Sequence, residues 1–543
     1  MRASHLRLYW ETVRHLRPVQ VWGRLWFRAV RPRPDTRPAP PLRAHHGRWA
    51  FPARRRQSQT GPDEFRFLNE TRALSRHGWD DAAVPKLWRY NLHYFDDLNA
   101  EGAQERRDWH EAAMARWIEE NPPGKGTGWE PYPTSLRIVN WIKWARGGNA
   151  LSADAVHSLA VQARWLTRRL ERHLLGNHLF ANAKALVFAG SHFAGAEAAH
   201  WRRLGLRLLA REVPEQILAD GGHFELSTMY HALALEDMLD LVNVTRSAGL
   251  PVPALWEEKI AAMRSWLAAM CHPDGEIAFF NDAAFGIAPS PGELERYAAA
   301  LDFAPLPPIE AACTWLRDSG YVRLQNRRAV VLIDVARVGP DYLPGHAHAD
   351  TLSFELSVDG RRVLVNSGIS VYGAGPERQR QRATAAHNTV TVDGEDSSEV
   401  WSGFRVARRA RPRGLSVTQD GAGWSVACSH DGYARLQGRP RHLRRWRFGK
   451  DRLIVADEVE GGYGSAEAAF HFHPGLSPRL LVDGGGTLAA GETAMLAWQT
   501  LKGQARLEPA IWHPGFGVSQ PSQRLAIALA GGESIVEFGW GGT

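Results

Sequence analysis

The sequence predicts an α+β protein of several domains, in which a helical region precedes a large antiparallel β-sandwich. Between about residues 63 and 305, apolar residues recur every three or four positions, which is the period of amphipathic helices. After about residue 315, short β-rich runs alternate with Gly, Asp and Pro, which is typical of antiparallel strands. A chain of 543 residues also exceeds one ordinary hydrophobic core. We therefore expect a leader over residues 1–62 and two domains over 63–310 and 311–543.

The leader is strongly basic. Residues 1–60 hold fourteen Arg and two acidic residues, so the rest of the chain is net negative although the whole chain carries +8. Residues 5–30 place apolar side chains at helical spacing between arginines, with an interruption at Pro18. Such a helix either lies on an anionic membrane surface or packs its apolar stripe on the next domain, and the sequence leaves both alternatives open. Residues 31–62 are rich in Pro and Arg, which indicates a linker or a wrapped arm.

Several classes of protein are disfavoured by these patterns. No apolar run is long enough to span a bilayer, and Arg or His interrupts every run near the start, so no secretory signal is recognised. We expect a cytoplasmic protein or one held peripherally on the inner membrane through residues 5–30, and a periplasmic one if the start site is misassigned. Nucleic acid is not an expected partner, because the basic charge lies in one leader without a nucleic-acid motif. Three cysteines without CxxC spacing imply no disulfide framework or zinc knuckle.

The helical region consists of stretches joined by short Gly, Pro or Asn punctuation. Helices so connected form either a bundle or a closed helical toroid. The clearest stretches are Trp109–Ile118, Leu136–Trp144, Ala155–Leu175 and Tyr230–Val244.

The strand region is a series of short runs with turn residues between them, which predicts an antiparallel sandwich. The expected strands are Tyr321–Leu324, Ala329–Val335, Leu352–Val358, Val363–Asn366, Thr389–Val392, Trp424–Cys428, Leu453–Glu458 and Ile535–Phe538.

A polar segment with period two introduces one of these strands. His346, His348 and Asp350 alternate after a turn signal and run directly into the alternating apolar residues of 352–356. Period two predicts a strand with all three polar side chains on one face at its mouth. Such a face suits catalysis or metal binding, although an isolated H-x-H pattern is also common as surface decoration.

Three clusters in the helical region carry further polar groups, at residues 88–95, 175–182 and 220–231. Taken singly, each has a structural explanation as a helix cap, a turn or a core tyrosine. Together they supply a carboxamide, imidazoles and a phenol, without the pair of carboxylates that glycoside hydrolysis uses. This inventory favours proton abstraction beside a carboxylate, where amide and imidazole donors stabilise an enolate.

The chain resembles the heparinase II/III-like family of polysaccharide lyases and the related toroid-fold alginate lyases. The stretches that carry the resemblance are Trp88–Leu98, Gly128–Lys143, Asn177–Asn182, Asp220–His231, His272–Asp282, Gly345–Leu356 and Ala386–Val392. The resemblance implies an N-terminal (α/α) toroid followed by a C-terminal antiparallel β-sandwich. It also implies β-elimination at a uronic acid, which leaves a C4–C5 double bond.

The resemblance implies four catalytic residues. Asn177 and His346 would neutralise the uronate carboxylate, and His178 would be the base for one C5 configuration. Tyr230 would be the acid, and for the other C5 configuration also the base.

The expected substrate is an anionic polysaccharide or oligosaccharide. Arg378 and Arg382 follow Tyr372 in a polar loop, where guanidinium groups suit carboxylate or sulfate, or form a solvated basic loop. The expected substrate-binding residues are Tyr90, His93, Trp129, Glu225, Tyr372, Arg378 and Arg382.

No cofactor is expected to be required for this chemistry. By resemblance, His348 and His387 match positions that hold a structural zinc in some members, together with an aspartate. Asn366 stands at the aspartate position, and a neutral amide is a poor zinc ligand, so a metal-free cluster is the alternative. A glutamate that some members carry near the toroid histidine is also replaced, by Ala181.

The sequence therefore predicts a lyase that cleaves a uronic-acid-containing bacterial polysaccharide. One alternative is a glycoside hydrolase or an epimerase on the same fold that acts on exopolysaccharide. The other is a non-catalytic polysaccharide-binding or assembly protein.

Overall fold

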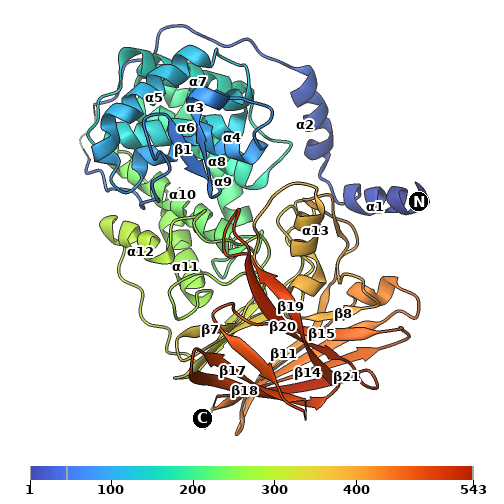
Figure 1. The fold of residues 1–543 in the computed structure, drawn as a ribbon. Helices are drawn as coiled ribbons and strands as arrows, with labels where there is room; N and C mark the ends of the chain where they lie inside the picture. Colours follow the sequence, from blue (N-terminus) through green and yellow to red (C-terminus); the bar gives the residue numbers. More distant parts are fainter. Residues whose placement is uncertain (1, 45–46, 483, 541–543) are drawn as a thin grey trace.

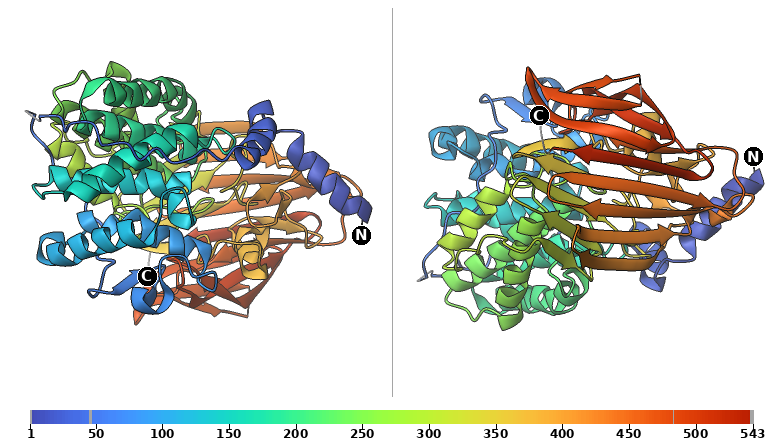
Figure 2. Two further views of the ribbon diagram at one scale, coloured as in Figure 1. Left: turned by 90° about the horizontal axis from the view of Figure 1, so that it is seen from above. Right: turned by 90° about the horizontal axis from the view of Figure 1, so that it is seen from below.

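Helices make up the first part of the chain and antiparallel strands the second (Figure 1). The computed structural model describes residues 2–44, 47–482 and 484–540. Seen from above and from below, the helices lie to one side of the molecule and the broad sheets to the other (Figure 2). The predicted fold class, a helical toroid followed by an antiparallel β-sandwich, is confirmed.

The toroid helices pack against one another in neighbouring pairs, and several of these pairs include α8. Their bounds are α3 (Leu74–His77), α4 (Lys86–Tyr94), α5 (Arg107–Glu120), α6 (Pro131–Arg146), α7 (Ala153–Arg168), α8 (Gly176–His192), α9 (Gly195–Gln216), α10 (Thr228–Ser247), α11 (Ala254–Ala269) and α12 (Pro291–Ala300). Helix α8 contacts α6, α7, α9 and α10, and nearly all of its residues are buried. A helix that is apolar around most of its circumference requires such a buried position.

Side-chain caps begin several helices. Ser152, Ser227 and Ser290 each accept a hydrogen bond from a backbone N–H in the first turn of α7, α10 and α12. Such caps satisfy donors that would otherwise lack a partner. The cap at Ser227 anchors the first turn of α10, which carries Tyr230.

Most of the later strands form three antiparallel sheets among the described residues. The five-stranded sheet, in spatial order, contains β3 (Cys313–Leu316), β4 (Tyr321–Gln325), β5 (Ala329–Asp334), β6 (Phe354–Val358) and β7 (Arg361–Leu364). The eight-stranded sheet contains β11 (Pro412–Asp420), β12 (Gly423–His430), β13 (Arg441–Phe448), β14 (Arg452–Glu460), β21 (Glu533–Gly539), β18 (Thr493–Lys502), β17 (Gly485–Ala490) and β16 (Ser477–Leu480). The four-stranded sheet contains β19 (Gln504–Trp512), β20 (Gln520–Ala528), β15 (Ala466–His471) and β8 (Val390–Val392).

Short elements complete the fold. Two hairpins are formed by β1 (Glu64–Phe67) with β2 (Glu70–Ala73) and by β9 (Val400–Trp401) with β10 (Arg405–Val406). Helix α13 (Pro376–Arg382) lies between the toroid and the sheets (Figure 1). The 3₁₀ turns are Asp96–Asn99, Ala103–Arg106, Thr127–Trp129, Thr384–Ala386 and Gly432–Arg435.

The sandwich core joins all three sheets. Phe354 of β6 contacts Trp446 of the eight-stranded sheet and Phe470 of the four-stranded sheet, with ring centroids 6.3 and 6.1 Å apart. All three rings are fully buried. The alternating apolar residues of 352–356 therefore face this core, as their period predicts.

The leader forms two helices and an extended arm. Helices α1 (Arg2–Val13) and α2 (Pro18–Ala29) break at the expected proline. The following arm runs along the toroid, where Leu42 bridges Phe193 and the Ala50 N–H donates to Asn243 Oδ1. Of the two alternatives for residues 31–62, the structure therefore shows a wrapped arm.

None of the described helices combines the length and apolar character that crossing a bilayer would require.

Two predicted boundaries are wrong. The helix expected to reach Leu175 ends at Arg168, because the next residues turn and Leu175 itself has φ +63°. The strand expected to begin at Leu352, with the H-x-H segment at its mouth, begins only at Phe354. Residues 345–353 are irregular because their polar groups bond to a loop of the toroid instead of to a neighbouring strand.

Candidate functional site

A pocket of about 460 Å³ lies where the toroid meets loops of the second domain. The predicted site residues that line it are Tyr90, Asn177, His178, Glu225, Tyr230, His346 and Tyr372. They come from α4, α8, α10 and three loops that are far apart in the sequence.

The start of α8 presents Asn177 and His178 to this pocket. Gly176, with φ +52°, allows the close approach there, because a Cβ would lie 2.4 Å from Leu343 and 3.0 Å from Glu225 Oε1. His178 Nδ1 lies 3.1 Å from Glu171 Oε1. Burial disfavours the imidazolium, but the charge and hydrogen bond of Glu171 outweigh it and raise the pKa of His178. His178 can therefore exchange a proton through its other nitrogen.

The first turn of α10 places Tyr230 beside His346. Their rings stack with centroids 3.8 Å apart, although the two residues lie in different domains. The Tyr230 hydroxyl is 3.0 Å from the hydroxyl of Tyr372. Burial, together with the neighbouring Tyr372 and Asp282, raises the pKa of Tyr230 well above its ordinary value. The phenol therefore remains protonated and is suited to donate a proton.

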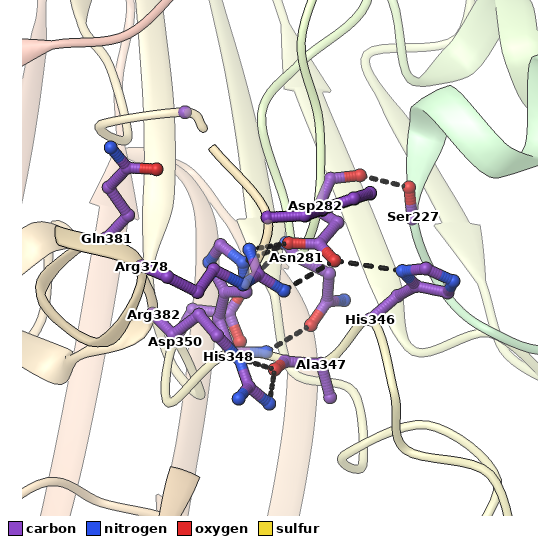
Figure 3. Close-up of polar contacts among 12 residues, drawn as sticks. Ser227, Asn281, Asp282, His346, Ala347, His348, Asp350, Arg378, Gln381 and Arg382 are labelled. Carbon is purple, nitrogen blue, oxygen red and sulfur yellow. Dashed lines mark hydrogen bonds and ion pairs between the residues drawn. The ribbon is translucent and has the colours of Figure 1, made fainter. Parts of the chain in front are cut away.

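Asp282 is the centre of a buried polar cluster (Figure 3). Its carboxylate accepts from His346 Nδ1 at 2.9 Å and from His348 Nε2 at 2.8 Å, and Nη1 and Nη2 of Arg378 also donate to it. Burial opposes ionisation, but Arg378 and the two histidines hold the pKa of Asp282 well below its ordinary value. The carboxylate thereby fixes which nitrogen of His346 faces the pocket.

Glu225 is a buried carboxyl group without a hydrogen-bond partner for Oε2 among the described residues. That oxygen lies 3.8 Å from His346 Nε2 at the pocket wall. Burial raises the pKa of Glu225, although His346 and His178 oppose the shift. A neutral carboxyl group here can donate a hydrogen bond to an anionic ligand.

Four predicted substrate-binding residues do not line the pocket, and their assignments are corrected here. His93 is fully buried and accepts from Trp117 Nε1, and the Trp129 indole donates to Asn121 O. Both belong to the aromatic packing of the toroid.

Arg378 and Arg382 are buried instead of solvated. Arg378 pairs with Asp282, and Arg382 donates through Nε and Nη2 to the Ala347 carbonyl. Both belong to α13, and their guanidinium groups are already bonded to Asp282 and to the backbone of the H-x-H segment. Neither is therefore positioned to bind a ligand in the pocket.

The donors near His348 do not fit a structural zinc ion. His348 Nδ1 lies 3.2 Å from His387 Nε2, and burial lowers their pKa values to about 4 and about 3. The Asn366 amide is already engaged, because its Nδ2 donates to Phe279 O and its Oδ1 accepts from the Asn388 N–H. No group of three or more His, Cys, Asp or Glu in the described chain could hold a metal. Two imidazoles are too few for a structural zinc.

Sequence reasoning missed several residues of the site. Arg24 of the leader, Arg55 of the arm, Asp96 and Tyr132 also line the pocket. Asp282 ends one of the stretches that carried the family resemblance, and this position was a usable signal. No signal in the sequence pointed to Glu171, because it lies seven positions before His178 and a turn separates the two residues.

Two family models cover most of the chain. The model described as "Heparinase II/III N-terminus" matches residues 103–293, and "Heparinase II/III-like, C-terminal" matches residues 309–540.

The individual proteins that match this chain have low sequence identity to it. A heparin-sulfate lyase of Pedobacter heparinus is 24% identical over 60% of this chain, and the chain spans only 50% of that protein. The FtsZ-localized protein C of Caulobacter vibrioides is 26% identical over 77% of this chain and 75% of its own length. Among solved structures, heparinase III matches with a TM-score of 0.66 at 17% identity, over 85% of this chain and 78% of that one. That likeness concerns the fold alone.

Proposed function

Because this chain belongs to the heparinase II/III-like family, we propose that it is a polysaccharide lyase that cleaves a uronic-acid-containing bacterial polysaccharide by β-elimination. The observation that carries the proposal is the meeting of Asn177, His178, Tyr230 and His346 in one pocket. These groups supply an amide, two imidazoles and a phenol around one cavity. The names of the heparin-sulfate lyase relatives support an anionic polysaccharide as substrate.

The reaction begins with charge neutralisation. The uronate carboxylate lies between Asn177 and His346, where donors stabilise the enolate that forms when C5 loses its proton. Burial raises the pKa of Glu225, and in its protonated form this carboxyl group supplies a further donor at the same wall. Asp282 holds His346 in place throughout.

Proton transfer then completes the elimination. His178 takes the C5 proton, the C5 electron pair forms the C4–C5 double bond, and the C4–O4 bond breaks. Tyr230 gives its proton to the departing O4 and regains one from solvent. The raised pKa of His178 and the protonated Tyr230 suit these base and acid roles. For the opposite C5 configuration, the family resemblance assigns both the base and the acid role to Tyr230, and the base role requires that the phenol first lose its proton, which its raised pKa opposes.

The pocket walls suit a sugar chain. Tyr90, Tyr132 and Tyr372 supply aromatic surface, and Arg24 supplies a cation at the same cavity. Aromatic faces pack against the apolar faces of sugar rings, and a guanidinium attracts carboxylate or sulfate groups.

The test is an ultraviolet scan of the purified protein with a panel of uronate polysaccharides, including the producing organism's own capsule or exopolysaccharide. An absorbance from unsaturated uronate is expected, and Tyr230→Phe should reduce its rate by about 10²- to 10⁴-fold. Tyr90→Phe is the matched control, since it removes a pocket hydroxyl that has no role in the chemistry.

The alternatives predict other results. A hydrolase or epimerase would give shortened or altered polymer without the absorbance. A polysaccharide-binding or assembly protein would leave the polymer intact but retain it, and the relative named FtsZ-localized protein C keeps this alternative in view. Mass spectrometry of the products and a direct binding assay separate these two outcomes.

We also propose that the protein acts in the cytoplasm or at the inner face of the inner membrane, with the periplasm as the alternative. The basic and apolar residues that alternate over residues 5–30 support contact with the inner membrane. Fractionation of cells that express the native protein tests it. Release with the periplasmic contents would contradict the proposal.

A further inference from the structure

Helix α2 has a docked face and a free face. On the docked face, Gln20 Nε2 donates to Tyr342 O at 3.0 Å, and Gly23 packs against His173, where a Cβ would lie at 3.0 Å. The Phe27 ring lies 4.4 Å from the ring of His173. These residues fall at positions i, i+3 and i+7, which is one side of a helix.

The free face of α2 is apolar. It carries Val21, Trp22, Leu25 and Trp26, whose exposed fractions lie between 53% and 65%. Four large apolar side chains exposed together within two turns of helix are unusual for a surface that meets only water.

Helix α1 is also docked in part and also carries exposed apolar side chains. The Tyr9 ring contacts Trp401 at 4.9 Å and the Thr12 hydroxyl accepts from the Trp401 indole, so one side of α1 is docked. Leu6 and Trp10 are 70% and 64% exposed on the same helix. Both helices extend along one flank of the molecule, outside the toroid and the sheets (Figure 1, Figure 2).

Unpaired arginines stand among these apolar residues. Arg7, Arg28 and Arg31 are exposed, and none forms an ion pair within the described part of the chain. Arginines beside exposed indoles match the boundary between the headgroups and acyl chains of an anionic bilayer.

We propose that the free faces of α1 and α2 form a docking surface for an anionic phospholipid membrane, on which the protein lies without crossing it. A second copy of the chain is a poor occupant, because a two-fold interface through this face would bring the same arginines against each other. Indole rings seat in the interface and guanidinium groups meet lipid phosphates.

The docking surface lies next to the pocket. Arg24 belongs to α2 and lines the pocket wall, so a membrane-bound α2 holds the pocket mouth close to the bilayer. If the proposed lyase function holds, the substrate is then a polysaccharide present at the membrane surface. The lipid docking itself does not depend on that function.

Vesicle co-sedimentation of the purified full-length protein tests the proposal. Phosphatidylcholine vesicles with phosphatidylglycerol should bind the protein, and vesicles of phosphatidylcholine alone should bind it at least tenfold more weakly. A Trp22→Ser, Leu25→Ser, Trp26→Ser variant should lose binding to both. Leu501→Ser, which removes an exposed apolar side chain from β18, is the matched control and should bind normally.

A second variant tests the charges without touching the apolar face. Arg7→Gln, Arg28→Gln, Arg31→Gln should weaken binding by about fivefold per arginine at low salt. Circular dichroism and the melting temperature verify that both variants are folded. Elimination of a soluble polymer by the Trp22/Leu25/Trp26 variant should equal wild type, so a failed lyase assay does not affect the membrane result.

Two outcomes overturn the proposal. One is equal sedimentation of wild type and the Trp22/Leu25/Trp26 variant with anionic vesicles. The other is absence of binding of wild type to anionic vesicles. A dimer in light scattering that this variant dissociates would then assign the surface to a second copy.

Discussion

Glu225 shows how one side chain can determine the pH range of the proposed reaction. It is buried beside His346 and His178, with Asp282 behind them, and its pKa is raised by burial. Below that raised pKa the group is neutral and can donate to the uronate carboxylate. Above it, a second negative charge would oppose the substrate, so activity is lost as pH rises through the pKa of Glu225.

Glu225→Gln should remove this dependence, because glutamine keeps an N–H donor but does not ionise. We expect kcat/KM within about tenfold of wild type at low pH and a smaller decline toward high pH. Glu225→Ala is the matched comparison and should be weak at every pH. An unchanged alkaline limb in Glu225→Gln would assign the decline to another group.

The His348–His387 pair leads to a prediction about metal. Both imidazoles are buried and neutral, and their facing nitrogens are 3.2 Å apart. Because two imidazoles without a further zinc ligand do not form a structural site, we expect purified protein to contain zinc well below one equivalent. Chelators should then leave the melting temperature unchanged. Elemental analysis and a thermal melt with a chelator check this. One equivalent of zinc with a chelator-sensitive melt would contradict it.

At the scale of elements, α13 holds the polar cluster at Asp282 and the H-x-H segment in place through two buried arginines. Its seven residues carry Arg378, Arg380 and Arg382 in a row that sequence alone describes as a basic loop. Helical geometry turns Arg378 and Arg382, four residues apart, into the interior and leaves Arg380 outside with Glu377. The element thereby separates two structural arginines from a solvated one.

Arg378→Met should therefore be strongly destabilising. It leaves the buried Asp282 carboxylate without its guanidinium partner, which costs about 3–5 kcal/mol of unfolding free energy. Arg380→Met, at a 42% exposed ion pair, is the control and should cost less than about 1 kcal/mol. Urea denaturation measures both, and adding Asp282→Asn to Arg378→Met should recover part of the loss.

At the scale of the whole molecule, buried polar contacts join the toroid to the sandwich. Asp282 bonds to His346 and His348, Asp350 accepts from the Asn281 N–H, and His272 contacts Glu355 at 2.8 Å. Each contact would leave a buried group unpaired if the two parts separated.

The two parts should therefore unfold together. Calorimetry of the full chain is expected to show one transition, and His272→Gln should move that whole transition to lower temperature. His473→Gln, a partly exposed histidine of the sandwich, is the control and should move it little. Two resolved transitions, only one of which shifts, would mean that the parts unfold independently.

The order of helices before strands, the break at Pro18 and the pocket residues Asn177, His178, Tyr230 and His346 were all accessible from the sequence. Apolar period and turn residues are local properties, and short motifs keep the residues of a site recognisable. Boundaries were less accessible. The polar side chains of the H-x-H segment point toward one loop, as their period predicts. The segment itself is not part of a strand, because its hydrogen bonds go to a distant part of the chain and not to a neighbouring strand.

Only the tertiary structure decided what the arginines and the leader do. Arg378 reaches its partner across 96 positions, and no local pattern reveals that a basic residue will be buried against one carboxylate. Likewise, the sequence left open whether the leader helices bury their apolar stripe. The structure leaves the apolar face of α2 exposed, because Gln20, Gly23 and Phe27, and not the tryptophans, contact the rest of the molecule. Side-chain direction relative to distant elements is a property of the packed molecule.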